Sequence, residues 1–244
     1  MCLKKILVTA ILMMYSSAAV GAVSEESKRF NNLGMGMYEQ RQYIAAAEAF
    51  LRSVETDPTN FLAHYNFACT LSLLREEYVP QIFKKEHIAS FDIDLQTILR
   101  HLKQAAELHE HRKVRMLEDP DLLAARSTLL FYQIAGMSLL RADDARVILP
   151  AVIWRLDYQS RFQEDGAFAA GAVSFSADGS FRLELWQSGE TFTGSYSIRD
   201  GRLILQQKRD AGSTGGLHAV LSERGAVITG IGREPLIMWN DITE

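Results

Sequence analysis

Residues 33–58 read LGMGMYEQRQYIAAAEAFLRSVETDP, and this stretch predicts two antiparallel helices joined by a short turn. Gly34 has no side chain, so a second helix can approach it closely. Ala46 and Phe50 are four residues apart, and they therefore share one face of the second helix. Pro58 stops that helix because it cannot continue the hydrogen-bond pattern. We expect the two helices at Ser27–Gln40 and Tyr43–Thr56.

The pattern returns after 34 residues, where a further helix is predicted to begin at Phe61. Tyr65, Phe67-Ala68 and Leu71 stand at that interval from Asn31, Leu33-Gly34 and Met37. The helix expected next is delayed by an insertion at 78–93, in which Pro80 prevents a continuous helix. Helical spacing then resumes as an apolar stripe of residues three and four apart. The stripe consists of Leu95, Ile98, Leu99, Leu102, Ala105 and Leu108.

Together these residues resemble the tetratricopeptide repeat (TPR), a helix–turn–helix unit of about 34 residues. The chain also resembles the closing unit of bacterial arrays of this kind. The matching segments are Tyr65-Asn66-Phe67-Ala68-Cys69, Leu102-Lys103-Gln104-Ala105 and Asp119-Pro120-Asp121-Leu122. Asp119 is a plausible helix cap, with Pro120 at the first helical position. The resemblance covers residues 27 to about 130, and it implies stacked hairpins with a concave binding surface. It also implies that Cys69 is a packing residue.

A change of periodicity near Pro150 divides the chain into two predicted domains. Residues 24–146 have helical spacing, and a last helix is expected at Ser127–Arg141. Residues 150–244 alternate apolar and polar side chains between Asp-Gly and Arg-Gly turns, which is typical of antiparallel hairpins. The fold class is therefore α+β, a helical array followed by an antiparallel β-meander that closes as a small barrel or folds as a sandwich. Residues 172–205 resemble lipocalin-like barrels of bacterial envelope proteins.

Residues 1–22 have the order of a bacterial secretory signal peptide. Lys4 and Lys5 precede an apolar run, and small residues follow up to Ala22. We therefore expect a periplasmic or secreted protein, with an uncleaved membrane anchor as the alternative because the apolar run is near the lower limit of a span. Cleavage would leave Cys69 as the only cysteine, so no internal disulfide is expected.

Composition and motifs argue against several classes of function. The formal charge of −4 gives no basic excess for nucleic acid. The sequence has no Gly-x-Ser-x-Gly, no His-Glu-x-x-His and no phosphate-binding loop, so we expect no enzyme and no cofactor. His101, His109 and His111 lack the spacing of a helical metal site, so they are predicted to lie on a solvated, charged helix face. The glycine-rich stretch 212–216 is expected to be a hairpin loop.

The concave face of the helical array is the preferred binding site. By the resemblance, its partner-binding residues would be Asn31, Met35, Tyr38, Tyr65 and Asn66, and Cys69 would lie on the same face. These residues suit an extended peptide or a helix, so the preferred function is an exported, non-enzymatic adaptor that binds a protein partner in the cell envelope.

Three alternatives to this function stay open. The two repeats could only support their neighbour, or the β domain could be a stability cap for the array. The β domain could instead be a carrier for a small molecule or lipid, with an apolar ligand inside the barrel. In that case Trp154, Phe175, Phe181, Phe192 and Tyr196 would line a cavity, whereas in the preferred interpretation they fill the core.

Overall fold

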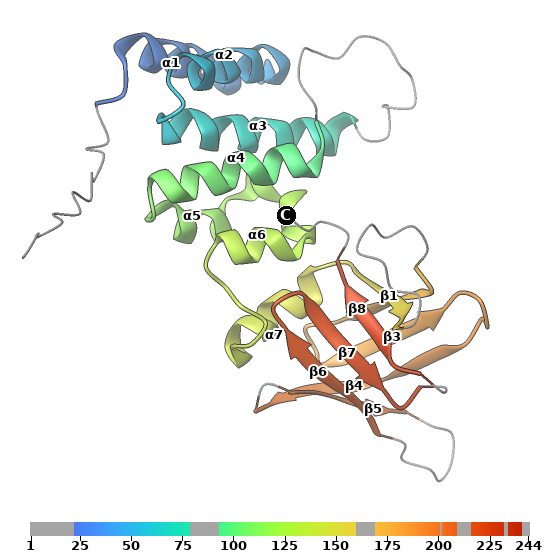
Figure 1. Cartoon of the computed structure of the whole chain (residues 1–244). Coiled ribbons are helices and arrows are strands. Elements are labelled where there is room, and N and C mark those ends of the chain that lie inside the picture. Colours follow the sequence, from blue (N-terminus) through green and yellow to red (C-terminus); the bar gives the residue numbers. More distant parts are fainter. Residues whose placement is uncertain are drawn as a thin grey trace, which may run out of the picture.

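The computed structural model describes residues 22–78, 93–159, 169–200, 202–208, 216–231 and 234–240. Within these residues, a helical half precedes a closed antiparallel barrel, which confirms the predicted α+β class. Figure 1 shows the helices stacked at one end of the molecule, with the barrel at the other end and α7 between them. The predicted signal peptide, most of the insertion at 78–93 and most of the stretch 212–216 lie outside the described residues.

The described helices follow the predicted order through the first four elements. They are α1 (Glu25–Glu39), α2 (Tyr43–Thr56), α3 (Phe61–Tyr78), α4 (Leu95–Leu108), α5 (Arg112–Glu118), α6 (Leu129–Ile134) and α7 (Ala142–Ala151), with 3-10 turns η1 (Pro120–Leu122) and η2 (Ala125–Ser127). Asp119 does act as a cap, since its side chain accepts a hydrogen bond from the backbone of Asp121. The element that it caps is the short turn η1.

The first hairpin is held by a close contact between its helices and a buried polar cluster. A Cβ atom placed on Gly34 would lie 2.6 Å from Cε1 of Phe50, so α1 and α2 can approach this closely only over glycine. At the other end, the hydroxyl oxygens of Ser27 and Ser53 lie 2.9 Å apart. Asn60, just before α3, donates to the Ser27 hydroxyl at 2.9 Å. These buried polar groups are therefore satisfied within the stack.

Two glycines of α1 provide a test of this packing. Gly34→Ala is expected to lower the free energy of unfolding by about 1–3 kcal/mol, because the new methyl group would displace the Phe50 ring in a filled core. Gly36→Ala is the matched control, since nothing lies within 4 Å of its added Cβ. This control is expected to raise stability by roughly 0.5–1 kcal/mol through helix propensity alone. Urea denaturation followed by circular dichroism measures both, and equal effects would contradict the packing argument.

The predicted helix at Ser127–Arg141 is wrong in its length, because α6 covers only Leu129–Ile134 and a non-helical segment follows up to α7. The helix α6 begins after Thr128, whose hydroxyl accepts from the backbone of Phe131. It ends at Ile134, and Gly136 follows with a φ of 84°, a conformation that glycine adopts without strain. The next helix, α7, runs to Ala151 and contains Pro150, so the change to strands comes a few residues later than that proline.

The barrel is an up-and-down meander of eight strands. They are β1 (Trp154–Tyr158), β2 (Gly171–Phe175), β3 (Ser180–Leu185), β4 (Thr191–Arg199), β5 (Arg202–Gln207), β6 (Gly216–Ser222), β7 (Gly225–Thr229) and β8 (Leu236–Trp239). Each strand pairs antiparallel with the next, and β1 pairs with β8 to close the barrel. Of the two predicted architectures, the structure has the barrel. Its form is compatible with a lipocalin-like barrel.

Alternation along the strands places apolar side chains inside the barrel. On β3, for example, Phe181, Leu183 and Leu185 are buried, while Arg182 between them is exposed. The inner side chains of the other strands join the same buried cluster. Val220 on β6 departs from this pattern, since it is apolar and yet 59% exposed on the outside. The barrel interior is therefore packed by its own side chains, as is common for small barrels.

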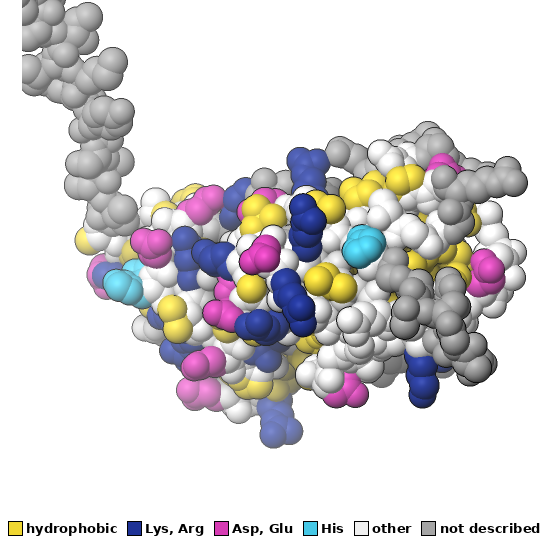
Figure 2. Space-filling model, turned by 90° about the horizontal axis from the view of Figure 1, so that it is seen from below, with side chains coloured by type: hydrophobic (Ala, Val, Ile, Leu, Met, Phe, Trp, Pro, Cys, Tyr) yellow, Lys and Arg dark blue, Asp and Glu magenta, His cyan; other side chains and the backbone are white. Residues whose placement is uncertain are grey.

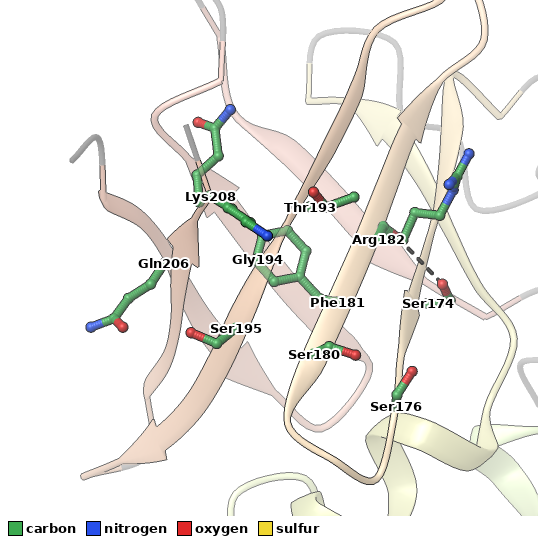
Figure 3. Close-up of a pocket in the computed structure, with 11 residues that line it drawn as sticks. Ser174, Ser176, Ser180, Phe181, Arg182, Thr193, Gly194, Ser195, Gln206 and Lys208 are labelled. Atoms are coloured by element: carbon green, nitrogen blue, oxygen red, sulfur yellow. Dashed lines mark hydrogen bonds between the residues drawn. The ribbon is translucent and has the colours of Figure 1, made fainter. Parts of the chain in front are cut away.

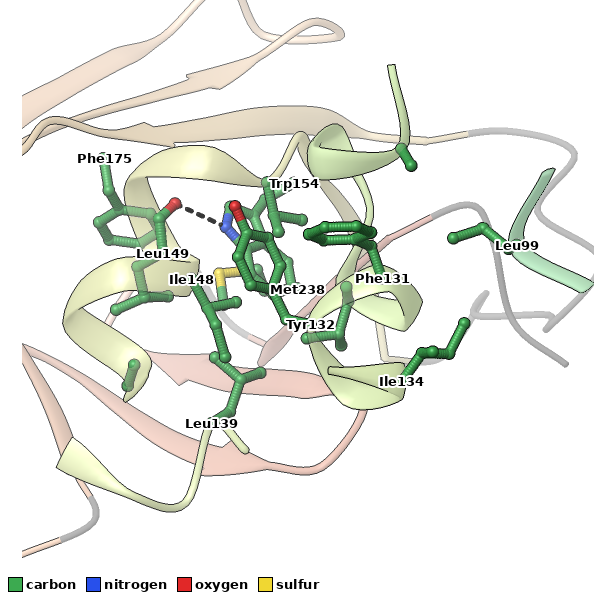
Figure 4. Close-up of a cluster of buried hydrophobic side chains, with 14 of the residues drawn as sticks. Leu99, Phe131, Tyr132, Ile134, Leu139, Ile148, Leu149, Trp154, Phe175 and Met238 are labelled. Atoms are coloured by element: carbon green, nitrogen blue, oxygen red, sulfur yellow. Dashed lines mark hydrogen bonds between the residues drawn. The ribbon is translucent and has the colours of Figure 1, made fainter. Parts of the chain in front are cut away.

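A continuous core joins the helical half to the barrel. Ile148 and Leu149 of α7 lie among buried side chains from the barrel and from α6, as Figure 4 shows around Trp154 and Phe131. The indole nitrogen of Trp154 donates to the carbonyl oxygen of Leu149 at 3.0 Å. α7 therefore covers the end of the barrel at which β1 begins.

Hydrogen bonds from the end of the barrel reinforce this junction. The Asn240 side chain accepts from the backbone of Leu129 at 3.2 Å and donates to the carbonyl oxygen of Ile153 at 2.9 Å. On another side, the Ser138 hydroxyl donates to the Glu223 carboxylate at 3.0 Å. Two separate parts of the barrel rim thus contact the segments around α6.

Among the helices in the described ranges, none is both long enough and apolar enough to cross a bilayer.

Candidate functional site

The predicted concave face carries a cluster of two tyrosines and two aspartates. The Tyr65 hydroxyl, on α3, donates to the Asp119 carboxylate at 2.7 Å. The Tyr38 hydroxyl, on α1, donates to the carboxylate of Asp121, which lies within η1. Cys69 lies below them, with its sulfur 4.0 Å from the Asp119 carboxylate. The segment that begins η1 therefore lies against this face of α1 and α3.

Burial and the neighbouring acids keep the donors of this cluster protonated. Burial raises the pKa of Tyr38, and the hydrogen bond to Asp121 raises it further. The pKa of Tyr65 is raised mainly by burial as well, with contributions from Cys69 and Asp119. Burial and the two carboxylates raise the pKa of the Cys69 thiol well above its ordinary value. At neutral pH the cluster therefore has neutral phenols and a neutral thiol next to carboxylates.

This chemistry bears on whether the cluster is a metal site. Ligand atoms of Cys69, Asp119 and Asp121 all lie within 4.8 Å of one another. A thiol must lose its proton to bind a metal, and burial beside two carboxylates opposes that loss. Each carboxylate also already accepts a phenol hydrogen. The arrangement therefore favours a hydrogen-bonded cluster, which fixes η1 in place, over a metal site. This agrees with the packing role that the TPR resemblance implies for Cys69.

The predicted partner-binding residues all lie near this cluster, but they differ in accessibility. Asn31 is 7% exposed, and its side-chain oxygen accepts from Asn66 at 3.0 Å. Tyr65 is 3% exposed. Met35, Tyr38 and Asn66 are half-buried. The half-buried side chains of Met35 and Asn66 are therefore the predicted residues that a partner could contact without displacing the segment of η1.

Sequence reasoning missed an aromatic and cationic group next to the cluster. The ring of His109 stacks on Phe61, with 4.4 Å between their centroids. The Arg112 guanidinium lies over both Phe61 and Tyr65, at 5.3 Å and 5.4 Å from their ring centroids. Cation–π contacts of this kind are attractive. The spacing of Phe61 and Tyr65 by four residues was a signal that they share a helix face, but nothing local indicated Arg112.

The prediction of a solvated face for the three histidines is wrong for His101. Its side chain is buried, and its Nδ1 lies 2.8 Å from Nδ1 of His64 on α3. The other nitrogen of His64, Nε2, lies 3.0 Å from the carbonyl oxygen of Pro58 and donates to it. Burial lowers the pKa of both histidines, and that of His101 falls to about 3, with His64 and Arg100 contributing. His111 is exposed, as predicted.

The barrel offers a second candidate site, on its outer face. Of the five aromatic residues considered for an inner cavity, Trp154, Phe175 and Phe181 are buried, and Phe192 and Tyr196 pack against the core. Their burial supports the interpretation that they fill the barrel. A pocket of about 690 Å³ lies over strands β2 to β5, and Figure 3 shows that many of its labelled side chains are small and polar.

On the face shown in Figure 2, no single type of side chain forms a continuous patch. Lys and Arg side chains gather in the middle of this face, but acidic and hydrophobic side chains lie between them. Within the described part of the chain, ion pairs such as Arg146 with Asp143 and Arg182 with Glu184 connect surface residues close in sequence. Such mixed surfaces are typical of solvated protein faces.

Comparison with known proteins identifies no relative of this chain. No protein-family model, curated protein or solved structure matches it.

Proposed function

We propose that this protein is an exported, non-enzymatic adaptor of the cell envelope, whose helical hairpins bind a protein partner as a short TPR-like array. Export rests on the signal-like residues 1–22, and the array rests on the repeat spacing of residues 27–130. The helices α1 to α4 at the repeat positions are consistent with stacked hairpins.

One observation carries the proposal of peptide binding. The face formed by α1 and α3 already holds an acidic turn of the same chain, η1 with its cap Asp119, because Tyr38 and Tyr65 donate to Asp121 and Asp119. Such a face has the donors and the aromatic surface that recognise an extended peptide. A partner segment would lie beside this one, over Met35 and Asn66, where the side chains are half-buried.

The neighbouring residues indicate the chemistry of the partner. Arg112 presents a guanidinium beside the aromatic rings of Phe61 and Tyr65. Arginine pairs well with carboxylates, and aromatic rings accept apolar side chains. We therefore expect the partner segment to combine an acidic residue with an apolar one. The alternative of an apolar carrier has less support, because the aromatic side chains that would line its cavity are packed together.

Site-specific cross-linking in the producing cell tests this function. A photoreactive side chain at Met35 is expected to capture a defined partner, while one at Glu48, exposed on α2, is the matched control. Met35→Glu combined with Asn66→Glu should lower the affinity for the captured partner at least about tenfold, through charge repulsion of an acidic segment. Capture at both positions alike, or unchanged affinity of the double variant, would contradict binding at this face.

A further inference from the structure

The outer pocket of the barrel is lined mostly by polar side chains from neighbouring strands. The register aligns Ser174, Arg182 and Thr193 across β2, β3 and β4. A second row runs through Ser195 of β4 and Gln206 of β5. All five side chains line the pocket. The first row covers β2 to β4 and the second β4 to β5, so the two parallel rows together reach four adjacent strands, as Figure 3 shows.

A glycine between the two rows shapes the floor of the pocket. A Cβ atom on Gly194 would lie 1.9 Å from the backbone oxygen of Gln206 and 2.9 Å from Cε1 of Phe181. No other residue type fits this close approach of β4 to β5, and both Gly194 and the Phe181 ring line the pocket. The close approach of β4 to β5 at the floor of the pocket is therefore built into the backbone.

Three hydroxyl groups of the pocket, those of Ser174, Thr193 and Ser195, are available to a ligand, whereas the Ser180 hydroxyl donates to the Asp178 carboxylate at 2.7 Å. Ser174 donates its hydroxyl hydrogen to the Arg182 carbonyl oxygen at 3.4 Å, so its lone pairs remain free to accept. The hydroxyls of Thr193 and Ser195 make no hydrogen bond within the described part of the chain. Hydroxyl and amide groups both donate and accept. They match a ligand whose own groups do both, which is the character of sugar hydroxyls.

The charges of the pocket argue against a phosphate ligand. The Arg182 guanidinium lies 2.5 Å from the Glu184 carboxylate, so this cation is already paired. Lys208 at the edge is the other cationic lining residue, and no described lining residue is acidic. Strong phosphate binding usually relies on several arginine, lysine or backbone donors together. A neutral ligand, or one with a single negative charge beside Lys208, fits the pocket better.

We propose that this outer pocket binds a short oligosaccharide, neutral or with an occasional carboxylate. Four strands spaced about 4.8 Å apart span about 14 Å, so the two rows suit linked sugar rings lying across the strands. The volume of about 690 Å³ lies within the usual range of ligand sites. Serine and threonine lose little side-chain entropy on binding, which favours recognition by many weak hydrogen bonds. The barrel would then be a carbohydrate-recognition module attached to the adaptor.

Titration calorimetry with four defined probes tests the pocket in the full chain without residues 1–22. The probes are chitotetraose, maltotetraose, tetragalacturonate and inorganic phosphate. At least one oligosaccharide is expected to bind with a Kd below about 1 mM. Thr193→Trp should weaken that binding at least about tenfold by filling the hollow. Thr191→Trp is the control on the same strand, since Thr191 is exposed and does not line the pocket.

Each outcome decides the proposal. Oligosaccharide binding that Thr193→Trp removes and Thr191→Trp retains supports it. Failure of all three oligosaccharides to bind at about 10 mM overturns it. Binding of phosphate alone overturns it in favour of an anion site. Equal loss of oligosaccharide binding in both tryptophan variants would place the ligand outside the pocket, and it would also overturn the proposal. Circular dichroism of both variants confirms that the barrel is folded, and Ser195→Trp provides a second filling variant.

Discussion

Trp154→Ala is expected to lower the free energy of unfolding of the whole protein by about 3–5 kcal/mol. The side chain is 1% exposed and is among the largest fully buried ones. Its removal would leave a cavity between α7 and the barrel, and the carbonyl oxygen of Leu149 would lose its indole donor. The loss combines the transfer free energy of the ring with the cost of the cavity, which the surrounding core can close only in part.

The location of Trp154 makes this variant a test of cooperativity between the two halves. Phe131 of α6, Ile148 of α7 and Phe175 of β2 belong to the same buried cluster as Trp154. If the helical half and the barrel share one core, both should melt in one transition, and that transition should fall by about 6–20 °C for a chain of this size. Differential scanning calorimetry, with far-ultraviolet and near-ultraviolet circular dichroism, measures the shift.

Trp186→Ala is the matched control for this experiment. Trp186 follows β3 at the opposite end of the barrel, and it is 54% exposed. Its replacement should change stability by less than about 0.5 kcal/mol, as is usual for surface positions. Two separate transitions in the Trp154 variant, with only the barrel transition shifted, would show that the halves are independent. That result would support the prediction of two domains that meet near Pro150.

Local patterns predicted the elements whose spacing is regular. The glycine at 34, the stripe of α4 and the Asp-Gly and Arg-Gly turns of the barrel each depend on residues close in sequence, and the structure has the corresponding hairpins and helix. Closure of the barrel was left open against a sandwich, because closure depends on the pairing of β1 with β8. These strands are separated by most of the domain, and no local pattern fixes their distance.

The region around Gly136 shows where local periodicity fails. Apolar residues spaced three and four apart continue from Leu129 to Leu140, so the pattern predicted one helix. In the structure the positive φ of Gly136 ends α6, and the Arg141 side chain donates to the Gly136 carbonyl oxygen. Leu129 and Ile134 of α6 are buried, but Leu140 lies in the non-helical segment before α7 and is 49% exposed. Periodicity therefore indicated burial correctly within α6 but wrongly predicted that the helix continues beyond Gly136.

Of the candidate sites, the sequence predicted the face of α1 and α3 but not what occupies it. Asn31, Met35, Tyr38, Tyr65 and Asn66 do lie together, because helix periodicity places them on one side of each helix. Contacts of Tyr38 with Asp121 and of Tyr65 with Asp119 span 83 and 54 residues of the chain. Contacts over such distances depend on tertiary packing. The outer pocket of the barrel was equally invisible, since its polar residues alternate with core residues as on any solvated sheet face.

The buried pair His64 and His101 should make the helical stack sensitive to acid. Because Nε2 of His64 donates to Pro58, its Nδ1 has a free lone pair and accepts the Nδ1 hydrogen of His101. His64 must be neutral for this arrangement, because its Nδ1 lone pair is the acceptor. The nearby groups oppose protonation of His101, since its neighbours include His64 and the cation Arg100, and Phe67 covers it edge-on at 4.8 Å. A proton on either ring would place a charge in the core between α3 and α4.

The sign of the effect follows from proton binding in the two states. Burial lowers the pKa of His101 to about 3 in the folded protein, whereas the unfolded chain has the ordinary value of 6.5. The unfolded state therefore binds more protons below pH 6.5, and stability falls as the pH decreases from that value toward 3. At pH 4.5 the loss from His101 alone is about 2–3 kcal/mol, given 1.36 kcal/mol per pKa unit. His64, whose pKa is also lowered by burial, adds to the loss in the same direction.

Urea denaturation at several pH values between 7 and 4.5 measures this loss, and His101→Asn isolates its origin. Asparagine keeps an N–H donor for Nδ1 of His64 but does not titrate. Below pH 6.5 the variant should therefore lose less stability than the wild type, by about 2 kcal/mol at pH 4.5.

His111→Asn is the control, because this exposed histidine of the neighbouring loop makes no buried pair. Carboxylates such as Asp57, whose pKa is lowered by hydrogen bonds, contribute equally to all three proteins, so the difference between the slopes reports the pair. Parallel stability profiles for His101→Asn and the wild type would mean that the histidines are protonated without cost, and that the stack of α3 on α4 does not depend on their neutral hydrogen bond.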